Sequence, residues 1–171
     1  MKTEMTPARI RRVVESFESR GVHYMVIAGV GLDGRRGYLT RSHQDLDVLC
    51  PKEGLSVIDD ILQRLGYVGT RYNDLYKAFD GRGGKLDIGL VSFEDDEAVM
   101  YGRIAITRFP KVLFDNPQRG GFDGVAFNVA PDELLKTWGS YSPKGSDAEY
   151  ASSLDVDEGL ASRITRELRQ E

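Results

Sequence analysis

Residues 24–49 constrain this chain most, because they join two strand-like runs through a short polar segment. The first run, Tyr24 to Ala28, is apolar and stops at Gly29, as a buried strand does where it meets a turn. The second run begins with Asp45 and Asp47. Residues i and i+2 of a strand project from the same face, so these two carboxylates should lie side by side. Like charges so close repel unless a cation lies between them, and oxygen ligands suit Mg²⁺ or Mn²⁺.

A third aspartate strengthens this interpretation, since an isolated D-x-D is commonly a solvated cap at the end of a strand. Asp87 is the one acid within the apolar run from Lys85 to Val91. A buried carboxylate is unfavourable unless it is paired or bound to a cation. If the Asp87 strand lies beside the Asp45 strand, the three acids could hold two divalent ions, an arrangement that suits phosphoryl and nucleotidyl transfer.

Two motifs around these acids then carry a resemblance. Gly29-Val30-Gly31-Leu32-Asp33, followed by Thr40-Arg41-Ser42-His43-Gln44-Asp45-Leu46-Asp47, resembles the signature of the nucleotidyltransferase superfamily in its antibiotic-modifying branch. That branch contains the lincosamide nucleotidyltransferases and the aminoglycoside adenylyltransferases, and reads roughly G-G-W-x-h-D, a spacer, then T-R-x-H-x-D-h-D. This chain has Ala28 at the first glycine and Val30 at the tryptophan. Ser146 stands where a lysine is common, with Lys144 nearby.

The resemblance implies an α/β (α+β) fold, a small mixed twisted sheet flanked by helices. We expect a catalytic domain at residues 1–140 and a C-terminal helical segment, residues 141–171, packed on it. The implied reaction is metal-dependent transfer of a nucleoside monophosphate, with ATP as the expected donor, to a hydroxyl of a small molecule such as an antibiotic.

The resemblance also assigns residues. Asp45 and Asp47 would hold both Mg²⁺ or Mn²⁺ ions, while Asp87 would ligate one ion and act as general base toward the acceptor hydroxyl. The nucleotide would be bound by Ala28, Gly29, Asp33, Thr40, Arg41, His43 and Lys144. In the family a helix begins at this first motif with its amides facing the phosphates. Four glycines in residues 29–37 predict that this helix is short.

The remaining charged residues near the motif have simpler interpretations. We expect Arg35 and Arg36 to be surface charges, and Arg41 to have a structural or phosphate-side role. For His43, a hydrogen bond that orients the loop before Asp45 is favoured over zinc binding, because the chain has one other histidine and one cysteine.

The composition of the chain disfavours nucleic acid and membranes as partners. The chain has 23 basic and 27 acidic residues, for a net charge of −4, which disfavours nonspecific nucleic-acid binding. One cysteine, Cys50, and the absence of any apolar run of membrane-spanning length favour a cytoplasmic protein without a membrane partner. Two alternative functions stay open: a nucleotidyltransferase acting on protein or tRNA, as in toxin-antitoxin systems, and a nucleotide-binding module without turnover. Assembly as a homodimer is open as well.

Periodicity predicts the supporting elements. A helix should begin at Pro7, capped by Thr6, and another should cover residues 55–65. Strands are expected at residues 67–72 and 76–79. Leu160, Ile164 and Leu168 recur every four residues and predict a terminal helix, with Asp157 as its N-cap.

Overall fold

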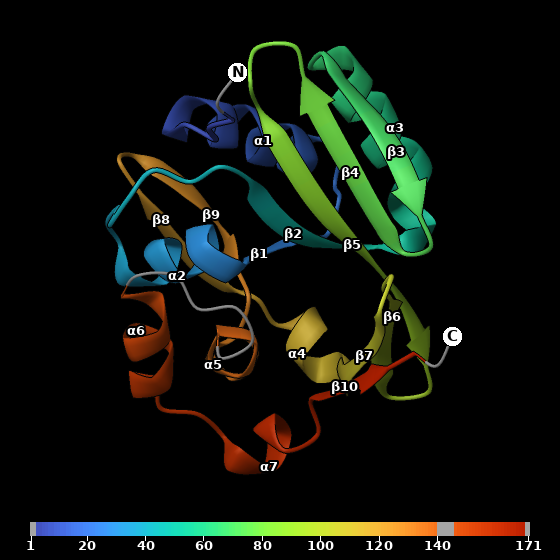
Figure 1. Cartoon of the computed structure of the whole chain (residues 1–171), viewed down its shortest axis with the longest axis vertical. Helices are drawn as coiled ribbons and strands as arrows, with labels where there is room; N and C mark the ends of the chain where they lie inside the picture. The colour runs from blue at the N-terminus through green and yellow to red at the C-terminus, as the bar shows by residue number, and fades with distance from the viewer. Residues whose placement is uncertain (1–2, 140–145, 170–171) are drawn as a thin grey trace.

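The computed structural model describes residues 3–139 and 146–169. Its strands form a mixed sheet in the order β10-β7-β6-β5-β2-β1-β9-β8, with β3 paired to β4 and β4 to β5 (Figure 1). Helices flank this twisted sheet, which confirms the expected fold class. The strands are β1 (Met25–Ile27), β2 (Leu46–Pro51), β3 (Tyr67–Tyr72), β4 (Leu75–Asp80), β5 (Lys85–Glu94), β6 (Glu97–Tyr101), β7 (Ala105–Pro110), β8 (Gln118–Phe122), β9 (Val125–Val129) and β10 (Thr165–Leu168).

The helices fill the connections between the strands. They are α1 (Pro7–Ser19), α2 (Ala28–Arg36), α3 (Leu55–Arg64), α4 (Lys111–Asp115), α5 (Asp132–Gly139), α6 (Asp147–Ser153) and α7 (Glu158–Ala161), with a 3-10 turn at Lys52–Gly54. Among the described residues, no helix is both long and apolar enough to span a membrane.

Strand β5 is the centre of the sheet. Its first half runs parallel to β2 and antiparallel to β4, and its last residues pair with β6. In the β2–β5 register Asp47 lies directly opposite Asp87. The prediction that the Asp87 strand lies beside the Asp45 strand is therefore confirmed.

The first predicted helix is confirmed as α1. Thr6 caps it by accepting a hydrogen bond from the Arg9 amide, and Pro7 occupies its first turn. Its apolar stripe is fully buried against the sheet, at Ile10, Val13, Val14 and Phe17. Helix α3 buries a similar stripe, and Figure 1 shows both helices behind the sheet in that view.

Helix α2 is short, as the glycines predicted, with nine residues. The glycines also allow it to approach the sheet closely. A Cβ on Gly31 would lie 2.9 Å from the Val26 carbonyl oxygen, and one on Gly34 would lie 2.6 Å from the Phe127 ring. Side chains at these positions would push α2 away from β1 and β9.

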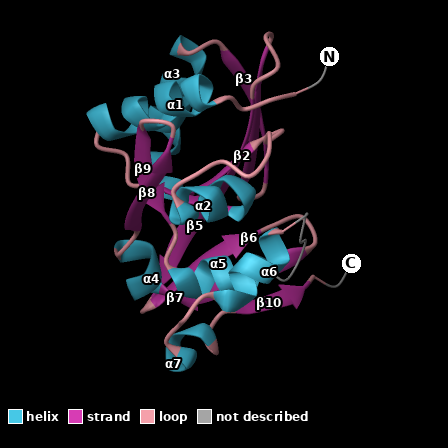
Figure 2. Ribbon diagram, turned by 90° about the vertical axis from the view of Figure 1, so that its left-hand side faces the viewer, coloured by secondary structure: helices cyan, strands magenta, loops and turns pink. Residues whose placement is uncertain are grey.

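The chain end differs from the predicted helix. Asp157 does cap α7, by accepting a hydrogen bond from the Leu160 amide, but α7 ends at Ala161. Residues Thr165–Leu168 then form β10, which pairs antiparallel with β7. Ile164 is buried whereas Leu168 is 68% exposed, so the apolar spacing does not form one buried helical face. Hydrogen bonds to the free edge of β7 outweigh the local helical pattern. Figure 2 shows α5, α6 and α7 near this strand.

The start of α2 is strained. Ala28 has φ 57°, in the left-handed region that favours glycine, and it stands where the related motif has glycine. Relief of this strain should outweigh the greater chain entropy of glycine, so we predict that Ala28→Gly raises the free energy of unfolding by up to about 1 kcal/mol. Urea denaturation would measure the difference.

Ala8→Gly provides the matched control. Ala8 lies in α1 and is not among the residues with positive φ, so the same change should lower stability by roughly 0.5–1 kcal/mol. Equal destabilisation by both substitutions would contradict the strain assigned to Ala28.

Candidate active site

A cavity of about 350 Å³ opens at the N-terminus of α2. Its wall comes from the first residues of α2, from the loop that leads into β2, from the end of α5 and from the first residue of α6. Six of the predicted site residues line it: Ala28, Gly29, Arg41, His43, Asp45 and Asp47. Asp33, Thr40 and Asp87 do not line it, and Lys144 lies outside the described residues.

The first turn of α2 lines the cavity without a side-chain cap from the described residues. Ile27 occupies the N-cap position, and no side-chain hydrogen bond caps the helix. Unpaired amides and the helix dipole make such an end favourable for an anion. The cavity therefore offers an anion-binding wall at Ala28, Gly29 and Val30.

Asp33 anchors the loop that follows α2. Its side chain is completely buried and accepts hydrogen bonds from the Thr40 amide at 3.0 Å and the Thr40 hydroxyl at 2.9 Å. His43 Nε2 lies 2.7 Å from Asp33 Oδ2, and facing a carboxylate this nitrogen must carry a proton. Burial raises the pKa of Asp33, but these bonds and one from Arg36 outweigh it and lower the pKa to about 2.

This bonding defines the roles of two predicted nucleotide-binding residues. Thr40 and His43 fix the path of residues 40–45 by bonding to Asp33, so His43 makes the loop-orienting hydrogen bond that the sequence favoured. The loop then delivers Asp45 to the rim of the cavity.

Arg36 is not the surface charge predicted from the sequence. Its side chain is 5% exposed, and Nη1 lies 2.7 Å from Asp33 Oδ1 and 3.3 Å from Asp147 Oδ1. Its guanidinium also stacks on the Tyr150 ring at 4.2 Å. Arg36 lies one helical turn after Asp33, so its guanidinium faces inward and balances two buried carboxylates. Arg35 instead pairs with Asp132 at the surface.

Gly29 makes room for Arg41. A Cβ at Gly29 would lie 2.5 Å from Arg41 Nη2 and 3.1 Å from the His43 ring. The Arg41 guanidinium reaches across to Asp147 Oδ2 at 3.0 Å, while its buried Nε has no hydrogen-bond partner among the described residues. Arg41 therefore links the loop to α6 and keeps a donor beside the anion-binding wall.

The three aspartates gather beside this cavity with two lysines. Lys85 Nζ lies 3.4 Å from Asp45 Oδ2 and 3.6 Å from Asp87 Oδ2, and Lys77 Nζ lies 3.9 Å from Asp87 Oδ1. Burial raises the pKa of Asp87 above its ordinary value, against the lowering effect of the two lysines. The Lys85 ammonium thus bridges two of the three acids.

The carboxylates of Asp45, Asp47 and Asp87 are of the chemical type that binds a divalent cation. Within residues 3–139 and 146–169, no three acidic, histidine or cysteine side chains converge closely enough to hold a metal where they now stand. However, Asp87 Oδ1 is buried without a hydrogen-bond partner among the described residues. A cation, the Lys85 ammonium, already lies between Asp45 and Asp87. Carboxylate oxygens on adjacent strands around a positive charge are the ligands that Mg²⁺ and Mn²⁺ prefer.

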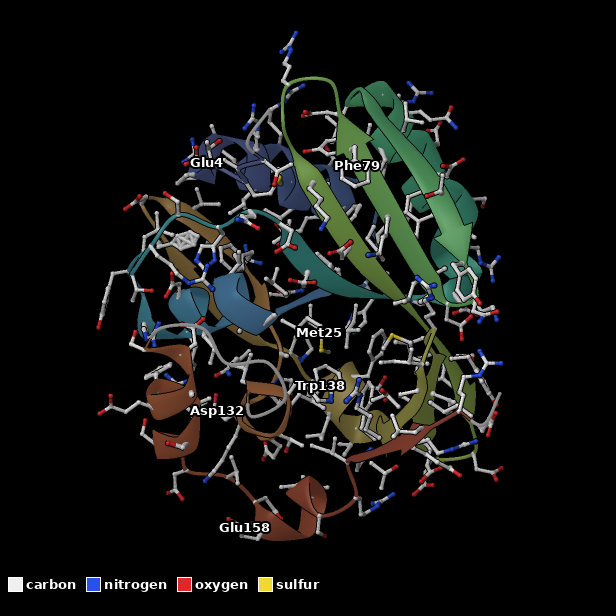
Figure 3. All side chains as sticks on the ribbon, in the orientation of Figure 1. Glu4, Met25, Phe79, Asp132, Trp138 and Glu158 are labelled. Carbon is white, nitrogen blue, oxygen red and sulfur yellow. The ribbon has the colours of Figure 1, made fainter. Side chains whose placement is uncertain are left out.

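Sequence reasoning missed three residues of this site. Arg36 could have been found by its helical spacing from Asp33, since residues three apart meet on one helix face. Asp147 and Trp138 reach the cavity from α6 and α5, far along the chain, and no local pattern predicts that contact. Trp138 is labelled in Figure 3, and its ring packs edge-on against Phe109 with centroids 5.6 Å apart.

The buried charges around Asp33 predict a large effect of its neutralisation. Asp33→Asn removes the carboxylate that Thr40, His43 and Arg36 share and leaves Arg36 with Asp147 alone, so we expect the free energy of unfolding at neutral pH to fall by about 3 kcal/mol. Chemical denaturation measures this loss. The same change at Asp60, which forms exposed ion pairs with Arg20 and Arg64, should leave stability nearly unchanged.

The pH dependence provides a second readout. The pKa of Asp33 in the folded protein, about 2, lies below its ordinary value of 3.8, so its contribution to stability is present above pH 4 and lost as the pH falls toward 2. The wild-type protein should lose about 2 kcal/mol more than Asp33→Asn over that interval. Parallel acid-unfolding curves would contradict the assignment.

Comparisons with known proteins identify the family and the fold. A family model described as aminoglycoside-2''-adenylyltransferase matches residues 9–117. The crystal structure of the lincosamide antibiotic adenylyltransferase LnuA, lincomycin-bound, superimposes with a TM-score of 0.71 at 17% identity, covering 90% of this chain and 100% of that one. ANT(2'')-Ia in complex with adenylyl-2''-tobramycin gives 0.66 at 18% identity, covering 91% and 94%.

No curated protein sequence matches the chain. At these identities the two structures show a shared fold, whereas the family model covers well over half of the sequence. These matches confirm the resemblance inferred from the two motifs. The chain therefore belongs to the aminoglycoside-2''-adenylyltransferase family of nucleotidyltransferases.

Proposed function

We propose that the protein transfers AMP from ATP to a hydroxyl group of a small molecule, such as an antibiotic, and releases pyrophosphate. The observation that carries this proposal is the placement of Asp47 opposite Asp87, beside a cavity walled by the first turn of α2. An anion-binding helix end next to a cluster of carboxylates is what a nucleoside triphosphate and its counter-ions require.

The residues of the cavity would orient the nucleotide. The α2 amides at Gly29 and Val30 would hold phosphate oxygens, and Arg41 would add its guanidinium from the loop. Trp138 offers a flat ring in the same wall against which the base can stack. Together these contacts would direct the α-phosphate toward Asp45 and Asp47.

Asp87 is the proposed general base. The acceptor oxygen attacks the α-phosphorus, its proton passes to the Asp87 carboxylate, and the bond from the α-phosphorus to the bridging oxygen breaks as pyrophosphate leaves. Burial raises the pKa of Asp87 above its ordinary value while no ion is bound to it.

Asp45, Asp47 and Asp87 would hold Mg²⁺ or Mn²⁺. When bound, these ions would neutralise phosphate charge and lower the pKa of the acceptor hydroxyl. The Lys85 ammonium now lies between Asp45 and Asp87, so it would have to move away when an ion binds there. Lys77 would keep a positive charge next to Asp87 during the exchange.

The sharpest test is Asp47→Asn. This change keeps the shape of β2 but removes a carboxylate, so metal-dependent pyrophosphate release should fall by at least about a hundredfold while the thermal midpoint changes little. The assay would use each NTP with Mg²⁺ or Mn²⁺ and a panel of lincosamides and aminoglycosides. Asp60→Asn, on the exposed side of α3, is the matched control and should retain full activity.

The outcomes separate the alternatives. Full activity in Asp47→Asn would overturn the metal assignment. Metal-dependent ATP binding without release for any acceptor would favour a nucleotide-binding protein without turnover. Release that occurs only with a protein or tRNA acceptor would replace the small-molecule acceptor in the proposal.

A further inference from the structure

A second cavity, of about 610 Å³, lies on the uncovered side of the β3–β4 hairpin. Strands β3 and β4 and the turn between β6 and β7 form its wall. Its size falls within the range of sites that hold small organic ligands. Figure 1 shows α3 behind these strands and no helix in front of them, and Phe79 stands on the front face at 47% exposure (Figure 3).

This cavity adjoins the proposed general base. Lys77 lines the cavity, opposes Asp87 in the β4–β5 register and places Nζ 3.9 Å from Asp87 Oδ1. Asp45 and Asp47, on the other side of Asp87, line the first cavity. The three acids therefore lie between two cavities, as a reaction that joins a nucleotide to an acceptor requires.

The wall of the second cavity carries positive charge. Among its described lining residues there is no acid, and Lys77 and Arg103 project cationic groups. Two acids pair with cations at the edge of this wall. Asp87 Oδ1 lies 3.9 Å from Lys77 Nζ, and the buried Asp74 Oδ1 lies 2.8 Å from Lys52 Nζ and 3.9 Å from Arg71 Nη2.

The same wall is also apolar and aromatic. Tyr72 and Ile104 line the cavity and are 58% and 60% exposed, which is unusual for such large side chains. The Arg103 guanidinium lies 5.8 Å from the centre of the Tyr72 ring. An occupant with a flat or apolar part could cover Tyr72 and Ile104 while an acidic group met Arg103.

We propose that this cavity is the acceptor site and that the acceptor is a hydroxylated small molecule carrying an acidic group and an apolar or aromatic part. This inference rests on the proposed nucleotidyl transfer, but it narrows the acceptor beyond the family name. A polyamine such as an aminoglycoside would place its ammonium groups against Lys77 and Arg103, where each close pair of like charges is unfavourable.

Three 4-nitrophenyl β-D-glycosides that share a ring system but differ in charge provide the test. They are the glucuronide, the glucoside and the 2-amino-2-deoxyglucoside, with anionic, neutral and cationic sugars. Binding to the full chain would be measured by calorimetry, and transfer by pyrophosphate release with ATP and Mg²⁺. Affinity should fall in that order, by about fivefold or more at each step, given the strength of a charge pair in water.

Two variants test whether the charge of Arg103 sets the order of affinities for the three glycosides. Arg103→Glu, at an exposed turn position outside the proposed catalytic residues, should reverse the order of the three glycosides. Arg64→Glu, on the solvent side of α3, should leave the order unchanged.

Each result bears on one proposal or on both. Tightest binding of the amino sugar, no binding of any glycoside, or an unchanged order in Arg103→Glu would overturn the acceptor assignment. Binding in the expected order without pyrophosphate release from any acceptor would support the site and contradict the proposed reaction. Asp47-dependent release with an aminoglycoside and no charge preference would support the reaction and contradict the site.

Discussion

The buried carboxylate of Asp33 is the constraint on which the rest of the site depends. A charge without solvent is stable only when hydrogen bonds and opposite charges replace the water. Here Thr40, His43 and Arg36 fill that role, with Arg36 at the end of α2 and the other two in the loop that follows. The hydrogen bonds that Asp33 accepts from Thr40 and His43 therefore fix where the loop enters β2, and with it the positions of Asp45 and Asp47.

Arg36 extends this constraint to the end of the chain. By contacting both Asp33 and Asp147 it ties α2 to α6, and Arg41 makes a second bond to Asp147. Asp147 of α6 lines one side of the cavity at the start of α2, and the start of α2 with the loop lines the other. Buried ion pairs through Arg36 and Arg41 therefore hold both sides in place. Small residues complete the arrangement, because Gly29 leaves space for Arg41 and Gly31 lets α2 approach β1.

The sheet places acids and cations on one surface. Asp47 and Asp87 meet because β2 and β5 are parallel and in register, and Lys77 reaches Asp87 from the antiparallel strand on the other side. Lys85 lies two residues before Asp87 and bridges it to Asp45. An ammonium group thus already offsets the charge of Asp45, one of the two acids of the D-x-D pair, and of Asp87. A divalent ion would have to compete with that group.

The sequence predicted the parts of this protein that depend on local patterns. The strand-like run that begins at Asp45, the cap at Thr6 and the glycines of α2 are short-range signals, and each corresponds to an observed element. The terminal helix was wrong because pairing with the edge of β7 decided the structure of residues 165–168. For Arg36 the spacing from Asp33 was a local signal, but its second partner, Asp147, lies 111 residues away in sequence. Contacts of this kind follow from tertiary packing and leave no local trace.

The central claim is that the start of α2 and the three aspartates form one nucleotide and metal site. A structure of the protein with α,β-methylene ATP and Mg²⁺ tests it most directly. The account predicts the triphosphate against the α2 amides and Arg41, metal density on Asp45, Asp47 and Asp87, and the Lys85 ammonium moved away from its bridging position. Nucleotide bound in another cavity, or Lys85 still bridging Asp45 and Asp87 with no metal beside them, would contradict it.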